Sequence, residues 1–221
     1  MGSHYLSGRQ VVYTRLEFGS RLLWDESSKK MFIDAFLDEK KNLGAEVYAF
    51  AVFSEQFYML TGRFGAYTEH EAYLDHLGAL DRFLAAGLIP EADMVRFREG
   101  TGLRFSVCCL SGIENILKVL MYIHLAARNL GYVRAGFDYW WSSVQTYRNR
   151  YSWSCLCTQV IYENLSPDPE RARRSLVRRH REQERSGNPA PECIHYPVIY
   201  SESGSGIQPL EDRRFRALSS M

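Results

Sequence analysis

The sequence has no charge excess of either sign. Its 221 residues include 27 Lys and Arg against 26 Asp and Glu, which gives a formal net charge of +1 at neutral pH. A protein that binds nucleic acid over a broad surface usually carries a clear basic excess. Any surface of that kind must therefore be local.

Long apolar runs and internal repeats are also missing. A membrane-spanning helix needs about 20 consecutive apolar residues, and the apolar stretches of this chain are shorter or interrupted. No hydrophobic signal segment precedes Gln10. We expect a cytosolic protein with one main domain, because a chain of this length can bury one sizeable core.

Cysteine occurs five times, and no pair has the C-x-x-C spacing of zinc knuckles and thioredoxin-like motifs. An odd number of cysteines fits reduced thiols better than a disulfide framework. We expect buried apolar thiols. Aromatic residues, in contrast, make up 14% of the chain, so the core should be rich in rings.

The first quarter of the chain predicts the order β-α-β-β. Residues 10–16 alternate as a strand does, and 26–41 have apolar residues at helical spacing after Asp25, a good N-cap. Residues 46–53 and 56–61 are rich in β-branched and aromatic residues and read as a hairpin.

More helix follows. Residues 105–110 fit a short strand and a buried loop equally well. Helices are predicted over 68–88, 113–127, 156–163 and 170–185. Beyond them, Gly, Ser and Pro predict disorder. We divide the chain into an α+β domain (8–145), a helical extension (146–186) and a disordered tail (187–221).

Two groups of residues could contact nucleic acid. Arginines crowd the last predicted helix at Arg171, Arg173, Arg174, Arg178, Arg179, Arg181 and Arg185. They could neutralise phosphates, or they could form a solvated face balanced by Glu. The aromatic residues Tyr139, Trp140, Trp141 and Tyr147 could stack on bases, or they could belong to the core.

Two segments resemble the REP-associated branch of the HUH single-tyrosine transposases. One is Val47-Tyr-Ala-Phe-Ala-Val-Phe-Ser-Glu-Gln-Phe-Tyr-Met-Leu60. The other is Tyr122-Ile-His-Leu125 followed by Phe137-Asp-Tyr-Trp-Trp-Ser-Ser143. The resemblance extends over residues 8–185. It implies a ferredoxin-like antiparallel sheet with helices on one face, a C-terminal helical extension, and a homodimer.

The resemblance also implies a chemistry. Such enzymes use a divalent metal to polarise a phosphate while a tyrosine attacks it and forms a 5′-phosphotyrosine link. Tyr122 stands at the nucleophile position. Gln56 and Tyr58 stand where a His-x-His pair would bind the metal, and Ala126 stands at the third ligand position. An amide, an un-ionised phenol and a methyl group make no ordinary Mg²⁺ or Mn²⁺ site, so we expect no metal, no other cofactor and no catalysis.

Three functions follow from these features. The first is a transposase-derived protein that binds structured or single-stranded DNA without cutting it. The second is a protein-interaction or dimerisation module on the same fold. The third is an active transposase with an unusual metal site, for which Glu55 is the nearest carboxylate. His124, in the Tyr-Ile-His-Leu segment, is either a structural histidine or a base.

Overall fold

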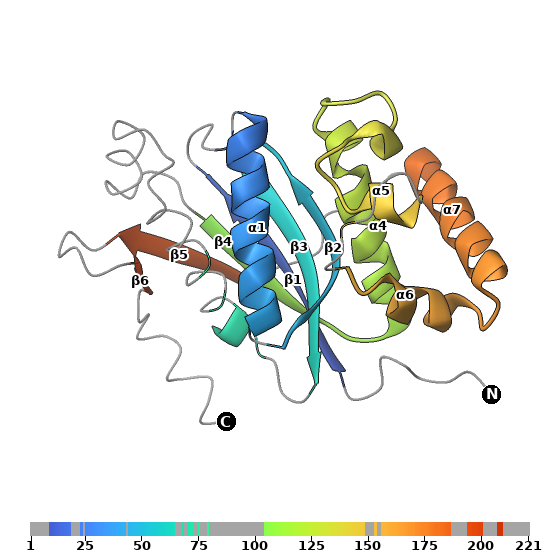
Figure 1. The fold of residues 1–221 in the computed structure, drawn as a ribbon, viewed down its shortest axis with the longest axis horizontal. Helices are drawn as coiled ribbons and strands as arrows, with labels where there is room; N and C mark the ends of the chain where they lie inside the picture. The colour runs from blue at the N-terminus through green and yellow to red at the C-terminus, as the bar shows by residue number, and fades with distance from the viewer. Residues whose placement is uncertain are drawn as a thin grey trace.

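The structure is a computed structural model. It describes residues 9–18, 23, 25–42, 44–64, 68, 70–72, 75, 79, 104–148, 153, 156–186, 194–200 and 207–209. In these residues an antiparallel sheet lies between helix α1 on one side and a group of helices on the other (Figure 1).

The sheet has the strand order β2-β3-β1-β4-β5-β6. Its strands are β1 (Arg9–Glu17), β2 (Glu46–Val52), β3 (Gln56–Phe64), β4 (Arg104–Leu110), β5 (Ile194–Tyr200) and β6 (Ile207–Pro209). The helices are α1 (Glu26–Asn42), α4 (Ile113–Asn129), the 3₁₀ helix η1 (Gly136–Asp138), α5 (Val144–Tyr147), α6 (Thr158–Leu165) and α7 (Pro169–Ser186).

The predicted β-α-β-β order is confirmed at the start of the chain. Asp25 caps α1, since its Oδ1 accepts the backbone N–H of Ser28 at 2.6 Å. β1 and β2 both pair antiparallel with β3, which lies between them, and β4 pairs antiparallel with the other side of β1. This is the ferredoxin-like order of an α+β fold, as the sequence predicted. β4 also settles the open question of residues 105–110.

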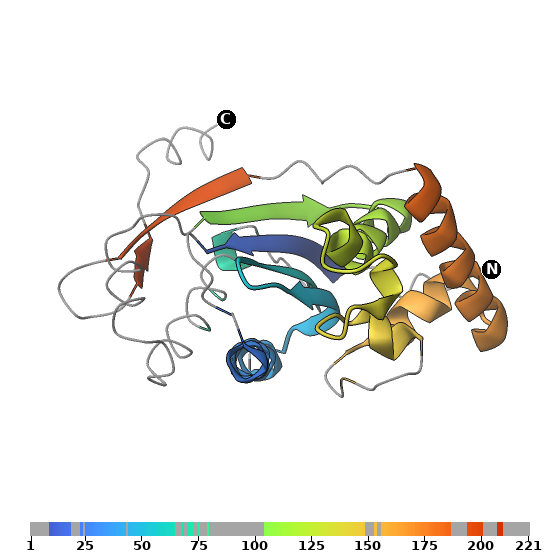
Figure 2. The same ribbon diagram turned by 90° about the horizontal axis from the view of Figure 1, so that it is seen from above.

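Helices occupy both faces of the sheet, which differs from the one-face arrangement that we expected. Phe32 and Phe36 of α1 pack against Phe57, with ring centres 5.0 and 4.9 Å apart. α4 packs on the opposite face, against a cluster that includes Tyr13 and Tyr58. Successive side chains in β1, β2 and β3 point to opposite faces of the sheet, and apolar residues occupy both positions. Both faces of the sheet are therefore apolar, and each is covered by helix. Figure 2 shows the sheet along its edge with α1 on one side.

A loop that includes the aromatic segment closes the outer edge of β2. Trp141 O accepts the N–H of Val52 at 2.9 Å, and the N–H of Ser143 donates to Phe50 O at 2.9 Å. The hydroxyls of Tyr139 and Tyr147 donate to carbonyls of the β2 region at 2.6 and 2.8 Å. These two tyrosines are therefore core residues, whereas the Trp140 side chain is 49% exposed.

The predicted disordered tail is wrong for part of its length. Residues 194–200 form β5, which pairs with β4, and 207–209 form β6, which pairs with β5. The segment from Ile194 to Tyr200 contains β-branched and aromatic residues that suit a strand. The outer edge of β4 offers it unpaired backbone groups.

The helix predicted over 68–88 lies mostly outside the described residues. Its start is described: the Glu71 carboxylate accepts the backbone N–H of Thr68 at 2.8 Å, and the Thr68 hydroxyl accepts the N–H of Glu71 at 3.2 Å. This reciprocal pair is a capping box. Within the described part of the chain, no helix combines the length and the hydropathy that crossing a membrane requires.

Candidate functional site

The resemblance placed its site on β3 and α4, and the structure brings those residues together. Gln56 and Tyr58 lie two apart on β3 and so point to the same face of the sheet, on which α4 packs. Tyr122 of α4 contacts this face, and Ala126 lies one turn further along the helix, buried in the same cluster.

Three tyrosines form the apolar part of the site. The Tyr13 and Tyr58 rings are stacked with centres 6.4 Å apart, and Tyr122 meets both edge-on, at 6.3 and 5.8 Å. Such perpendicular contacts are favourable because the ring edge is positive and the ring face negative. Tyr122 is thus a half-buried ring in an aromatic cluster.

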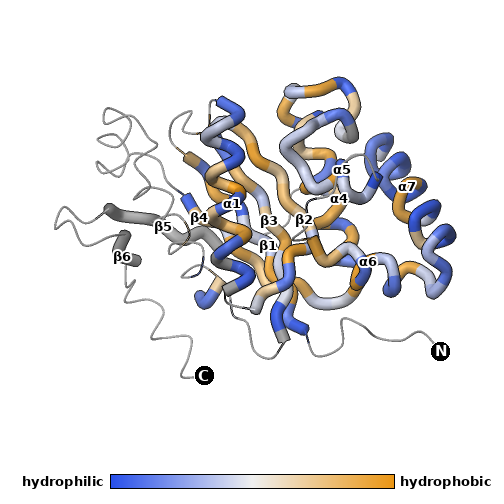
Figure 3. The backbone as a smooth tube through the Cα atoms, viewed as in Figure 1, coloured by the Kyte–Doolittle hydropathy of each residue, from blue (hydrophilic) through white to orange (hydrophobic). Residues whose placement is uncertain are grey.

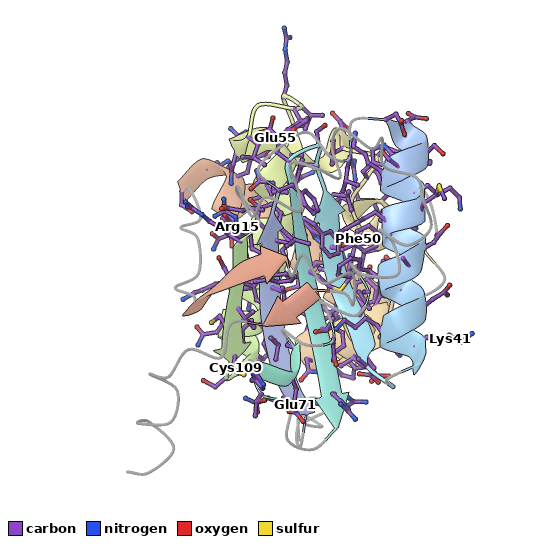
Figure 4. The ribbon with its side chains drawn as sticks, turned by 90° about the vertical axis from the view of Figure 1, so that its left-hand side faces the viewer. Arg15, Lys41, Phe50, Glu55, Glu71 and Cys109 are labelled. Atoms are coloured by element: carbon purple, nitrogen blue, oxygen red, sulfur yellow. The ribbon has the colours of Figure 1, made fainter. Side chains whose placement is uncertain are left out.

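Arg15 of β1, which sequence reasoning missed, provides the cation of the site. Its Nη2 donates to Gln56 Oε1 at 3.1 Å and forms an ion pair with Glu17. Its guanidinium carbon lies 5.6 Å from the centre of the Tyr58 ring, in a cation–π contact. Figure 4 shows Arg15 toward the end of the sheet that carries Glu55. The available signal was a charged residue on the face of β1 that also carries Tyr13.

These residues do not fit a divalent metal. Gln56 Oε1 already accepts two hydrogen bonds, from Arg15 and from the Tyr58 hydroxyl at 2.8 Å. Burial raises the pKa of Tyr58, so its phenol stays protonated and is a poor ligand. Ala126 has no donor atom, and the Arg15 guanidinium would repel a second cation.

The described residues offer no alternative ligand set. They contain no group of three or more His, Cys, Asp or Glu side chains close enough to share an ion. Glu55, the nearest carboxylate to Gln56 in the sequence, is exposed in the turn between β2 and β3. Cys108, Cys109 and Cys157 are only partly buried.

His124 belongs to a buried hydrogen-bond chain rather than to this site. Its Nδ1 lies 2.8 Å from Nε2 of His180 in α7, and its Nε2 lies 2.9 Å from the Ser143 hydroxyl. His180 Nδ1 lies 2.9 Å from Leu176 O, and the Phe50 N–H donates to Ser143 Oγ at 3.0 Å. Both imidazoles are almost entirely buried.

The hydrogen-bond partners of His124 and His180 determine which ring nitrogen of each carries the proton. A carbonyl only accepts, so His180 carries its proton on Nδ1, and its Nε2 accepts from Nδ1–H of His124. His124 Nε2 then accepts the Ser143 hydroxyl proton at 2.9 Å, and Phe50 O, 3.1 Å from the same hydroxyl, is the competing acceptor. Both histidines are neutral, and burial holds the pKa of His124 well below its usual range and lowers that of His180 to about 4.

This hydrogen-bond network of His124, His180 and Ser143 has a structural role. A serine next to an imidazole is the arrangement of a nucleophile and its base, but Ser143 and His124 are both 0% exposed, so no substrate reaches them. The network joins α4, α7, the loop before α5 and β2. His124 is therefore the structural histidine of the two alternatives, and it fixes α7 to the domain.

α7 carries five of the seven predicted arginines on its exposed side, whereas Arg173 and Arg179 are partly buried. Ala172, Leu176 and His180 are buried at a spacing of four residues and face the domain. On the exposed side lie Arg171, Arg174, Arg178, Arg181 and Arg185, which we call the arginine face. They recur every three or four residues over about 21 Å, from the helical rise. α7 is correspondingly hydrophilic in Figure 3.

Acidic residues neutralise only part of this helix. Arg179 forms a two-bond ion pair with Glu114 of α4, at 2.8 and 3.0 Å. Within the arginine face, Arg171 pairs with Asp168 at 3.4 Å and Arg178 with Glu182 at 3.7 Å. In the part of the chain that the structure describes, no ion pair involves Arg173, Arg174, Arg181 or Arg185.

Comparisons with known proteins give one similarity. No family model matches the chain, and neither does any curated protein. A solved structure of a REP-associated tyrosine transposase bound to a REP hairpin is similar, with a TM-score of 0.47 and 16% sequence identity. The similarity covers 73% of this chain and 87% of that one.

Proposed function

We propose that this protein is a transposase-derived DNA-binding protein that holds structured or single-stranded DNA and does not cut it. The arginine face of α7 is the observation that carries the proposal. Its guanidinium groups follow one side of an anchored helix at regular intervals, and a sugar–phosphate backbone is the extended polyanion that such a row matches.

The anchoring of α7 supports this role. The buried histidine pair and the Arg179–Glu114 ion pair hold the helix in one orientation, so the arginine face keeps pointing outward. A fixed row of charges loses less conformational entropy on binding than a mobile one. The near-zero net charge of the whole chain means that binding must rest on local positive surfaces such as this one.

The composition of the β3–α4 site supports binding without cleavage. A tyrosine hydroxyl attacks a phosphodiester only when the phosphate is polarised and the phenol can lose its proton. Around Tyr122 the positions implied for metal ligands hold Gln56, Tyr58 and Ala126. No strand transfer through a 5′-phosphotyrosine is expected.

A mobility-shift titration with a labelled DNA hairpin tests the proposal. The variant Arg174→Gln/Arg181→Gln/Arg185→Gln should bind at least tenfold more weakly than the wild type at low salt. If about four phosphates are neutralised, the slope of log K against log salt should be roughly −3 for contacts to the single-stranded loop and roughly −4 for contacts to the duplex stem. The matched control Lys29→Gln/Lys30→Gln/Lys41→Gln removes the same charge from α1 and should bind like the wild type. Lys41 lies at the far end of α1 from Glu55 (Figure 4).

The same mixtures with Mn²⁺ test the absence of cleavage. No covalent protein–DNA adduct should form. An adduct that disappears in Tyr122→Phe would overturn the inactive part of the proposal. A wild type that shifts no DNA at low salt would overturn the binding part and favour a protein-interaction module.

A further inference from the structure

Arg15 occupies an unusual place for an arginine. It lies in an inner strand of the sheet, directly opposite Tyr58 in the β1–β3 register, and its side chain is 31% exposed. Its neighbours in the α4 face are the rings of Tyr13 and Tyr58. A charge at such a position requires partners, and those present satisfy only part of its hydrogen-bonding capacity.

The guanidinium retains donors for a ligand. Both of its polar contacts, to Gln56 and Glu17, are made by Nη2. Nη1 makes no polar contact with the described residues, so its donors are available to a ligand, whereas Nε is buried and has no acceptor among them. A guanidinium has five N–H donors in a planar fork, and a buried donor without an acceptor is unfavourable.

The surroundings are positive despite Glu17. In the β1–β4 register Glu17 lies directly opposite Arg104, whose side chain therefore points to the same face of the sheet. Arg104 is exposed, and the described residues give it no ion pair. Two arginines thus face one carboxylate.

We propose that Arg15 binds a phosphate group of the DNA backbone and takes over the charge-neutralising role for which this site has no metal ligands. The inference rests on the proposed DNA binding and names a second contact on the α4 face, apart from the arginine face. Stacking on Tyr58 and the bond to Gln56 hold the guanidinium in place, so its planar fork is preorganised for a phosphate. Glu17 competes with that phosphate for Arg15.

The competition gives two substitutions with opposite effects. Arg15→Gln should weaken binding of the hairpin by about tenfold, as for loss of a hydrogen bond to a charged group. It should also reduce the size of the salt slope by about 0.7 to 0.9, the value for one phosphate of a single strand or of a duplex stem. Glu17→Gln should tighten binding several-fold, because it releases Arg15 and removes a negative charge. Lys30→Gln, on α1, is the matched control for a lost positive charge and should bind like the wild type.

Each result decides between a binding role and a merely structural one. If Arg15→Gln and Glu17→Gln both bind within twofold of the wild type while the arginine-face variant binds weakly, Arg15 is only structural and the proposed function stands. If Arg15→Gln does not fold, Glu17→Gln decides alone, since a structural ion pair predicts no gain in affinity. If the wild type binds no DNA, the proposed function fails and this inference fails with it.

Discussion

At the scale of single residues, the candidate site shows how a polar cluster can persist without a metal. The amide oxygen of Gln56 accepts two hydrogen bonds, one from Arg15 and one from the Tyr58 hydroxyl. These two bonds occupy the amide oxygen that could otherwise bind a cation. The result is a site in which the positive charge belongs to the chain itself.

The buried histidine pair predicts how stability depends on pH. In the unfolded chain a histidine has a pKa of about 6.5, whereas burial lowers that of His180 to about 4. The unfolded state therefore takes up protons first as the pH falls. Stability should be greatest above pH 6.5 and should decrease between about 6.5 and 4, by on the order of 3 kcal/mol from His180 alone.

Urea unfolding of the wild type and of His180→Gln, each at pH 7.5 and pH 5, measures this effect. The variant has one titrating group fewer, so its loss of stability between the two pH values should be smaller. An equal loss in both proteins would show that His180 is not the titrating group.

At the scale of elements, α7 combines an anchor with a binding surface. The sequence predicted one set of arginines, but the fold separates them, because Arg179 turns toward Glu114 and the arginine face points outward. Charge alone does not distinguish members of the set. Their partners do.

Single substitutions in α7 should reveal this division. Arg174→Gln should weaken hairpin binding about three- to tenfold with little effect on unfolding, as for the loss of one phosphate contact. Arg179→Gln removes the same charge but should affect binding less, and it should destabilise the fold by up to about 1 kcal/mol, because a partly exposed ion pair contributes little. Titrations and denaturant unfolding of both variants check the contrast. A larger binding loss for Arg179→Gln would mean that the ion pair with Glu114 opens when DNA binds.

Much of the fold could be predicted from local patterns, whereas the site could not. Periodicity and turn residues suffice for β1, α1, β2 and β3. Arg15 escaped prediction because its contacts depend on the register of β1 against β3, which sequence spacing does not show. His124 and His180 are 56 residues apart, and only the packing of α7 on α4 brings them together.

At the scale of the whole molecule, the sheet has more strands than the sequence indicated, since β5 and β6 continue it beyond β4. β5 is separated from β4 by all the C-terminal helices, yet it pairs with that strand and extends the sheet. The sequence predicted disorder over residues 187–221 because Gly, Ser and Pro are frequent there, although residues 194–200 themselves suit a strand. Residues 194–200 form a strand because they pair with the edge of β4, and a local sequence pattern does not show that this edge is available.

Removal of residues 187–221 should therefore affect stability. Loss of β5 would expose the backbone groups of the outer edge of β4, a template for pairing with another chain. We expect the shortened chain to unfold at lower denaturant concentration and to self-associate as its concentration rises. Denaturant unfolding and analytical ultracentrifugation measure the two effects. A shortened chain with unchanged stability and mass would mean that β5 contributes nothing to the sheet.

The edge of the sheet at β2 is covered by other parts of the chain, and this restricts how two copies could pair their sheets. Its amides and carbonyls are already engaged by the stretch containing Trp141 and Ser143, and by Cys157, whose N–H donates to Val47 O at 2.8 Å. Among the described residues, these bonds occupy the edge of β2 at Val47, Phe50 and Val52, where a second molecule would otherwise add a strand. If the homodimer implied by the resemblance forms by pairing of edge strands, the pairing must use the edge of the sheet opposite β2. The α7 helices of both copies would then lie far from the dimer interface.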